Sequence, residues 1–407
     1  MAESDELRAW LITIRTPGLG PGGLHWWLEH AGGDMRRVPA QLWRHRGTLG
    51  DAASAWLRRP DERRLEADRA WLSAPGHRLL CCTDADFPPQ LEHIPQPPAA
   101  LFVDGDASVL LLPQVALVGA RAASAGGLLH AERFARALVR SGFTITSGLA
   151  DGVDAAAHGA ALAGGGSTVA VMGTGPDLVY PRKHHALAQA IAARGVLLSE
   201  FPPGTPARAD HFPRRNRLIA GLALGTLVVE AGMRSGSLIT ARLAAEQGRE
   251  VFALPGSIDH ALARGCHRLI RDGACLVEEA AELVELLAPA ARMLGAELAA
   301  RLATPLAAPP STEWAPPGSD ARNGAVAAED GPGETPAEVA APAAADPAQA
   351  ALLRHIGYDP VGMDELARRT GWSSAALGAQ LLLLELAEQV ERLAGDRYRR
   401  RVVRVSE

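Results

Sequence analysis

A short apolar run that ends at a glycine recurs through the middle of this chain, beginning with VALVGARAAS at residues 115–124. The start of this segment shows no alternation of polar and apolar side chains, which is typical of a strand covered on both faces. Residues 126–140 then carry apolar side chains at helical spacing. A strand, a glycine turn and a helix form the opening unit of a doubly wound α/β domain, so the sequence predicts such a domain here.

Later segments repeat this unit. Further buried strands are predicted at residues 143–146, 168–172, 196–199, 226–229 and 251–254. A small polar turn containing glycine follows each of them. The carboxyl ends of parallel strands lie along one edge of an open sheet, where ligands bind. Since backbone N–H groups in such turns hold anions beside helix N-termini, the sequence predicts phosphate-sized cradles along this edge.

The chain divides into four predicted segments, of which the α/β domain is the second, at residues 81–287. Residues 1–80 are helical in pattern and contain a Pro-Gly-Leu-Gly turn, which fits either a helix-hairpin-helix motif or an ordinary connection in a small bundle. Residues 288–346 are rich in alanine, proline and glycine, which predicts a flexible linker. Residues 347–407 show three helices and a hairpin, the pattern of a winged helix. The third of these helices carries no basic residue, which argues against reading of a major groove.

The expected fold class is therefore α/β: an extended Rossmann-like, doubly wound and mostly parallel sheet, with a small helical N-terminal domain and a C-terminal winged-helix module. Five tryptophans are expected in the core of the helical domain: Trp26, Trp27, Trp43, Trp56 and Trp71. The start of the chain is acidic and no apolar run is long enough to span a membrane, so we expect a cytoplasmic protein with no membrane partner. The four cysteines lack metal-binding spacing, and no metal or cofactor site is predicted.

The charge balance limits the kind of anion site that the protein can have. A formal net charge of −5 and a pI near 6.2 argue against a basic footprint over the whole surface, so any site for a polyanion must be local. Lys183 is the only lysine, and nearly all the positive charge is guanidinium, which can make bidentate contacts to phosphate.

Several familiar nucleotide and catalytic motifs are absent from the strand ends. Lys183 is followed by His184 rather than Ser or Thr, which excludes a Walker A loop. Arg121 stands where the dinucleotide fingerprint needs its second glycine, which argues against hydride transfer. His158, on the helix predicted after Asp154, is interpreted as a packing histidine rather than a catalytic base.

The densest group of cations falls at residues 211–221, where Arg214, Arg215 and Arg217 surround the start of a predicted helix. Because positive side chains oppose the helix dipole there, they suggest a bound anion or an acidic partner. Ion pairs with Glu200, Asp210 or Glu230 explain any single arginine equally well. Three aromatic residues fall in the same turns: Tyr180, Phe201 and Phe212. They could stack on the bases of a single strand, worth ~1–3 kcal/mol per base, or be buried in the core.

Successive blocks of the α/β domain now identify a family. The blocks are VGARAAS at 118–124, SGLADGVDAAAH at 147–158, AVMGTGPD at 170–177, FPRRNRLIAG at 212–221 and SGSLITA at 235–241. In this order they resemble the DprA/Smf family, the DNA-processing protein A of bacteria. The resemblance extends to the helical N-terminal domain and to the winged-helix module that many members carry.

The resemblance implies a non-catalytic protein that binds single-stranded DNA without sequence preference, forms a homodimer through the sheet domain, and loads the RecA recombinase during natural transformation. Carried over by motif, the implied DNA-binding residues are Arg121, Ser124, Ser147, Gly148, Arg182, Lys183, Phe212, Arg215, Asn216 and Arg217. His184 and His185 stand where the family usually has an asparagine after its Tyr-Pro pair, so the contacts of that corner differ.

Two other functions compete with this interpretation. A nucleotide phosphoribohydrolase on the same fold would use a glutamate beside a glycine turn, and here Glu230 precedes such a turn instead of following it. A protein-recruiting scaffold would use its winged helix and leave the sheet edge unused. Release of ribose 5-phosphate would support the enzyme, and failure to bind an oligonucleotide at low salt would support the scaffold.

Overall fold

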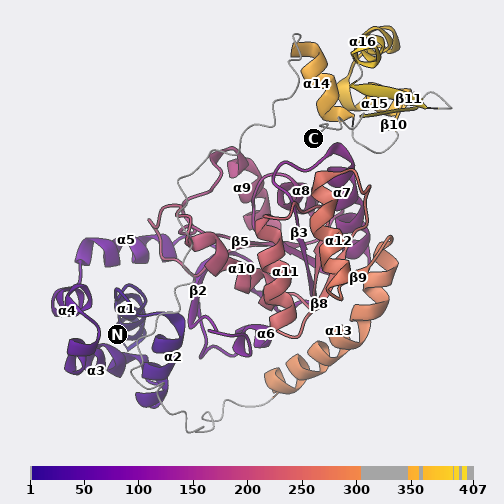
Figure 1. The fold of residues 1–407 in the computed structure, drawn as a ribbon. Helices are drawn as coiled ribbons and strands as arrows, with labels where there is room; N and C mark the ends of the chain where they lie inside the picture. Colours follow the sequence, from indigo (N-terminus) through magenta and orange to yellow (C-terminus); the bar gives the residue numbers. More distant parts are fainter. Residues whose placement is uncertain (1, 304–346, 357–360, 388, 394–396, 401–407) are drawn as a thin grey trace. The chain divides into compact units, whose positions relative to one another are not determined.

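The computed structural model describes residues 2–303, 347–356, 361–387, 389–393 and 397–400 (Figure 1). The chain forms two compact units, Met1–Pro305 and Leu306–Glu407. The first holds the N-terminal helices and the large sheet, and the second holds a small helical module with its own sheet. Over the described residues no helix combines the length and the apolar character needed to cross a bilayer.

Five helices form the N-terminal domain. They are α1 (Ala2–Ile14), α2 (Pro21–His30), α3 (Val38–Arg44), α4 (Asp51–Arg58) and α5 (Glu62–Leu72). Local chemistry sets their starts: Pro21 occupies the first turn of α2, and the Asp61 carboxylate accepts the Arg63 N–H at the start of α5. The tryptophan prediction was wrong in part, because Trp10 is the buried indole and the five expected ones are only half-buried.

The large sheet has nine strands in the order β1-β2-β6-β5-β4-β3-β7-β8-β9. Their bounds are β1 His77–Cys81, β2 Ala100–Gly105, β3 Gln114–Val118, β4 Thr144–Ser147, β5 Thr168–Val171, β6 Val196–Ser199, β7 Gly225–Val228, β8 Glu250–Ala253 and β9 Cys275–Leu276. From β6 through β5, β4, β3, β7 and β8 to β9, each strand pairs in parallel with the next one in the sheet. Strand β2 is antiparallel to both of its neighbours, β6 and β1. The predicted doubly wound, mostly parallel sheet is therefore confirmed.

Helices cover both faces of this sheet (Figure 1). Residues of α7 (Ala125–Arg140), α8 (Val153–Ala163) and α13 (Ala280–Ala303) pack with Val115 and Leu117 of β3 on one face. On the other face, residues of α6 (Pro89–Glu92), α10 (His211–Leu222), α11 (Gly236–Glu246) and α12 (Arg264–Arg271) pack with Ala116 and Val118. Helix α9 (His185–Arg194) packs over β5 and β6. The central strands are apolar on both faces because each face meets a helix layer.

Helix α13 corrects the predicted start of the linker. It continues through Pro289 to Ala303, so residues 288–303 belong to a helix rather than to a flexible linker. Leu287 and Leu294 are buried in the same core cluster, and this anchorage holds the helix together across a proline that lacks an N–H donor. Residues 304–346 of the predicted linker lie outside the described residues.

The second unit has the predicted winged-helix pattern. Its elements are α14 Pro347–His355, β10 Val361–Gly362, α15 Met363–Thr370, α16 Ser374–Leu386, β11 Val390–Leu393 and β12 Arg397–Arg400. The strands form an antiparallel sheet in the order β10-β12-β11. Leu381 and Leu384 of α16 are buried in its core, while Leu382 and Leu383 are exposed. The third helix thus presents leucine rather than arginine to solvent.

Candidate nucleic-acid interface

The carboxyl ends of the parallel strands lie side by side, in the order of the sheet. The turns that follow β3, β4, β5, β6 and β7 comprise residues 119–124, 148–152, 172–182, 200–210 and 229–235, and together we call them the rim. Helices α7, α8, α10 and α11 begin at or beside these turns. Of the DNA-binding residues implied by the resemblance, Arg121, Ser124, Gly148 and Arg182 lie in the rim. Ser147 ends β4 just before it, Lys183 follows it directly, and Phe212, Arg215, Asn216 and Arg217 lie on α10.

The predicted cradle at the start of α7 is filled by a carboxylate of the protein itself. The backbone N–H and the hydroxyl of Ser124 donate to the two oxygens of Glu230 at 2.8 and 2.5 Å. A Cβ on Gly127 would lie 2.4 Å from the Glu230 carboxyl carbon, so only glycine lets the carboxylate lie this close to the helix start. Negative charge is favoured at a helix N-terminus, and here Glu230 supplies it in place of a ligand.

A second internal carboxylate fills the turn after β4. Asp154 accepts the N–H groups of Gly148 and Ala150 at 3.1 and 3.3 Å. Burial raises the pKa of Asp154, against the lowering effect of the Arg215 charge and of these two N–H donors. The Ser147 hydroxyl is fully buried and donates to the Leu117 carbonyl at 2.6 Å. The prediction of open backbone cradles is therefore wrong at these two turns.

Arg215 points into the protein rather than toward solvent. One of its terminal nitrogens donates to the carbonyls of Gly148, at 2.7 Å, and Val171, and its Nε donates to Asn216 Oδ1 at 3.2 Å. Burial lowers the pKa of Arg215 to about 10, which still leaves it charged at neutral pH. The expected phosphate contact of Arg215 does not fit this position, because its guanidinium holds the ends of β4 and β5 together.

Arg217 is also buried, and its Nη2 pairs with Glu200. Burial lowers the pKa of Arg217, and the Glu200 charge partly restores it. The same carboxylate accepts Nε of Arg214 at 3.2 Å. The sequence left open whether these arginines bind an anion or pair with acidic side chains of the protein. For Arg214 and Arg217 the structure shows an acidic side chain, Glu200. Arg217 is thus a structural cation, whereas the Arg214 side chain is 44% exposed.

The exposed part of the rim combines aromatic rings with cations. Arg121 is exposed, and its guanidinium carbon lies 5.7 Å from the centre of the Phe212 ring. Tyr180 is 49% exposed and also lies 5.7 Å from the Phe212 ring centre. A Cβ on Gly173 would approach the Phe212 ring to 3.0 Å, so glycine at the end of β5 makes room for this ring. We call Arg121, Tyr180 and Phe212 the aromatic patch.

Three further exposed cations follow members of the aromatic patch within three residues of the chain: Arg182 and Lys183 after Tyr180, and Arg214 after Phe212. Arg182 and Lys183 begin the 3-10 turn η4 (Arg182–His184), and both are exposed, as is Arg214. Lys183 Nζ lies 2.9 Å from Asp151, and the Lys183 side chain is 66% exposed. His184 is held by the Leu149 carbonyl and by Asp151, at 2.9 and 3.1 Å. The Lys183–Asp151 pair is exposed, and such pairs contribute ~0–1 kcal/mol, so Lys183 can turn toward an incoming anion at small cost.

His158 lies beneath the rim and is fully buried, with Nδ1 2.7 Å from Thr168 Oγ1. Burial lowers its pKa to about 3, so it is neutral in the folded protein. The interpretation as a packing histidine is confirmed.

The sequence did not reveal the pairing of Glu230 with Ser124 or of Asp154 with the Gly148 turn. The only signal was an acidic residue close to each glycine turn.

Comparison with protein families finds two matches. The family described as DNA recombination-mediator protein A matches residues 78–288, and the DprA winged helix domain matches residues 335–396. Protein Smf of Escherichia coli strain K12 is 48% identical over 224 residues, which are 55% of this chain and 60% of that protein. Less than two thirds of the E. coli protein is therefore covered. Protein Smf of Synechocystis is 37% identical over 334 residues, 80% of each chain.

A solved structure agrees with these sequence matches. The X-ray structure of DNA processing protein A (DprA) from Streptococcus pneumoniae superimposes with a TM-score of 0.61 and 35% sequence identity. The match covers 68% of this chain and 97% of the pneumococcal chain. The similarity therefore includes nearly all of a known member of the family.

Proposed function

Because this chain belongs to the DprA/Smf family of DNA-processing proteins, we propose that it binds single-stranded DNA along the rim and delivers it to a recombinase. The observation that carries the proposal is the aromatic patch, in which the exposed side chains of Arg121 and Tyr180 both lie beside the Phe212 ring. Arginine beside exposed aromatic rings is the arrangement that holds single strands without regard to sequence. The contacting residues in this proposal are Arg121, Tyr180, Arg182, Lys183, Phe212 and Arg214.

Six of the ten residues implied by the resemblance act indirectly in this proposal. Ser147, Arg215 and Arg217 are buried, and the Gly148 N–H is taken by Asp154. They shape the turns from which the exposed residues project. Ser124 and Asn216 are half-buried and hydrogen-bonded to Glu230 and Arg215, so they position the start of α7 and α10. The exposed residues thus carry the affinity, and the buried ones fix the geometry.

Single strands are favoured over duplex because Tyr180 and Phe212 need an unpaired base to stack on. A base within a duplex already stacks on its neighbours and offers no free face. Four exposed cations, Arg121, Arg182, Lys183 and Arg214, can each neutralise one phosphate. With −0.7 per phosphate for single strands, log affinity should fall against log salt with a slope near ~−3.

The role is proposed to be binding rather than catalysis. Glu230, the glutamate next to the glycine turn that was compared with that of a phosphoribohydrolase, is engaged by Ser124 and lies 3.6 Å from His260. A carboxylate held in this way is not presented to a nucleotide. Incubation with nucleoside monophosphates should release no ribose 5-phosphate, and measurable release would overturn this part of the proposal.

Loading of the RecA recombinase, homodimer formation and a cytoplasmic location complete the proposal, and family membership is what supports them. A direct test of loading would measure the DNA-dependent ATP hydrolysis of RecA on a coated single strand, with and without this protein. Faster onset supports loading, and no change contradicts it. Light scattering at micromolar concentration would give the oligomeric state.

Fluorescence anisotropy with matched oligonucleotides tests DNA binding itself. A labelled 20-residue oligothymidylate and a duplex of the same length would be titrated with the full chain from about 50 to 200 mM salt. Tighter binding of the single strand, with the slope given above, supports the proposal. Equal affinity for both forms, or an affinity that does not change with salt, contradicts it.

A further inference from the structure

A cavity of about 540 Å³ lies beside the rim, between the helical domain and the turn after β6. The helical domain contributes Arg15, Arg64 and Trp71 to its wall. The turn contributes residues 203–206 and Arg208, and His211 at the start of α10 also lines the cavity. The sequence offered no hint of this site, because its cations come from segments more than 130 residues apart in the chain.

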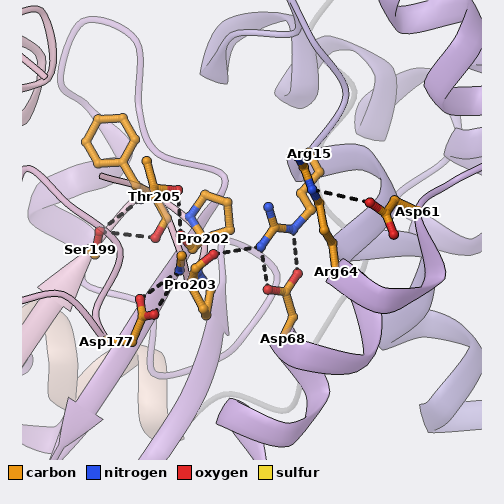
Figure 2. Close-up of polar contacts among 11 residues, drawn as sticks. Arg15, Asp61, Arg64, Asp68, Asp177, Ser199, Pro202, Pro203 and Thr205 are labelled. Carbon is orange, nitrogen blue, oxygen red and sulfur yellow. Dashed lines mark hydrogen bonds and ion pairs between the residues drawn. The ribbon is translucent and has the colours of Figure 1, made fainter. Parts of the chain in front are cut away.

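The cavity is held in shape by polar contacts across the two regions, as Figure 2 shows. Arg15 pairs with Asp68 through both ends of its guanidinium, at 2.6 and 2.5 Å, and the same group donates to the Pro203 carbonyl at 2.8 Å. The Asp68 side chain is fully buried. On the other side of the turn, Asp177 accepts the Gly204 N–H. These contacts fix the turn against α5, so the cavity exists before any ligand arrives.

Two arginines of the wall remain available to a ligand. Arg64 lies 3.4 Å from Asp61 and Arg208 lies 3.1 Å from Asp210, and both arginine side chains are more than 60% exposed. Because exposed pairs of this kind are weak, either guanidinium can turn from its carboxylate to a phosphate, which it binds in bidentate fashion. Trp71 adds an aromatic wall, since its ring lines the cavity and packs on His77 at a centroid distance of 4.0 Å.

The cavity lies next to the aromatic patch along the edge of the sheet, as the order of the strands shows. Strand β6 is the neighbour of β5, so the turn after β6 comes next along the edge after Tyr180 and Arg182. His211 joins the two regions: its ring stacks on Phe201 at 4.1 Å, and it directly precedes Phe212 of the aromatic patch. A strand that leaves the aromatic patch toward β6 therefore meets the cavity.

We propose that this cavity is a second subsite for single-stranded DNA, in which Arg64 and Arg208 clamp a phosphate and Trp71 contacts the adjoining sugar or base. This rests on the proposed function, since the strand must first be held at the rim. The helical domain then takes a direct part in binding and lengthens the DNA segment that each chain covers.

The test compares short and long oligonucleotides on the full chain. The cavity variant carries Arg64→Ala and Arg208→Ala, and a control variant carries Arg59→Ala and Arg63→Ala, which removes the same charge from exposed sites that do not line the cavity. Anisotropy titrations would use labelled oligothymidylates of 6 and 20 residues at several salt concentrations. Urea unfolding of each variant would confirm that it is folded.

The cavity variant should bind the 6-residue strand like the unchanged protein and the 20-residue strand roughly tenfold more weakly. Its salt slope on the long strand should be smaller by about 1.4, which is 0.7 for each of two lost phosphate contacts. Unchanged binding of the long strand, or equal losses for the cavity and control variants, overturns the subsite and leaves the rim proposal intact. Failure of the unchanged protein to bind either strand overturns both proposals.

Discussion

Charged residues beneath the rim and on its outer surface behave in opposite ways. Beneath the rim the charges are buried and paired inside the protein, as in Glu230 with Ser124 and Arg215 with the Gly148 carbonyl. Toward the helical domain, Arg64 and Arg208 are exposed and held only by exposed acids. The difference separates charges that build the turns from charges that a polyanion can recruit, although both kinds look alike in the sequence.

The largest effect expected on the buried side comes from Glu200→Ala. Its loss leaves Arg217 buried without its counterion, which should lower the free energy of unfolding by about 3–5 kcal/mol. Urea denaturation measures this. The matched control is Asp210→Ala, which removes an exposed partner of Arg208 and should leave the unfolding midpoint unchanged. Similar losses in both variants would break the distinction between buried and exposed pairs.

On the exposed side, the double variant Arg121→Ala with Arg182→Ala should weaken single-strand binding roughly ten- to hundredfold. Its unfolding midpoint should not move, because both side chains are exposed. Anisotropy titration measures the affinity. Arg140→Ala with Arg194→Ala, at the ends of α7 and α9, is a control of equal charge. If the two double variants bind equally well, the aromatic patch is not the DNA site.

A buried ionisable group should also make stability depend on pH. The pKa of His158 is about 3 when folded and about 6.5 when unfolded, so between these values the unfolded chain binds more protons and acid favours unfolding. The contribution is fully present above pH 6.5 and falls by about 2 kcal/mol between pH 7 and pH 5. Urea unfolding at both pH values measures it, and His158→Gln should reduce the difference. An identical pH response in this variant would contradict the assignment.

The smallest effect expected comes from a single ring. Tyr180→Ala removes one half-exposed stacking surface and should weaken binding by about 1 kcal/mol, the lower end of the range for stacking, with no change for duplex DNA. Tyr180→Phe keeps the ring and should bind like the unchanged protein. A loss in the phenylalanine variant would mean that the hydroxyl, rather than the stacking surface, matters.

The sequence predicted the sheet well because its strands are covered on both faces and stop at glycine turns, as at Val118 and Gly119. It predicted the rim but misjudged which arginines face solvent. Arginine is rarely buried, and the burial of Arg215 depends on carbonyls of Gly148 and Val171 that lie 67 and 44 residues away. No local sequence pattern indicates which distant residues will be the partners of a side chain.

The same limit explains the other differences. Pro289 is a reasonable place to end a helix, yet the core contacts of Leu287 and Leu294 carry α13 past it. The cavity depends on Arg15 meeting the Pro203 carbonyl, a contact between two regions that the sequence treats as separate. In each case tertiary packing, which acts between distant residues, decides the outcome.

The internal carboxylates at the strand ends affect whether free nucleotides can bind there. Folds of this kind commonly hold ATP or dinucleotides by the phosphates at these turns, but here Glu230 and Asp154 already occupy the donors. Free nucleotides therefore find no open backbone donors at these two turns. Millimolar ATP should compete with the oligonucleotide only at the exposed cations of the rim, and not at these two turns.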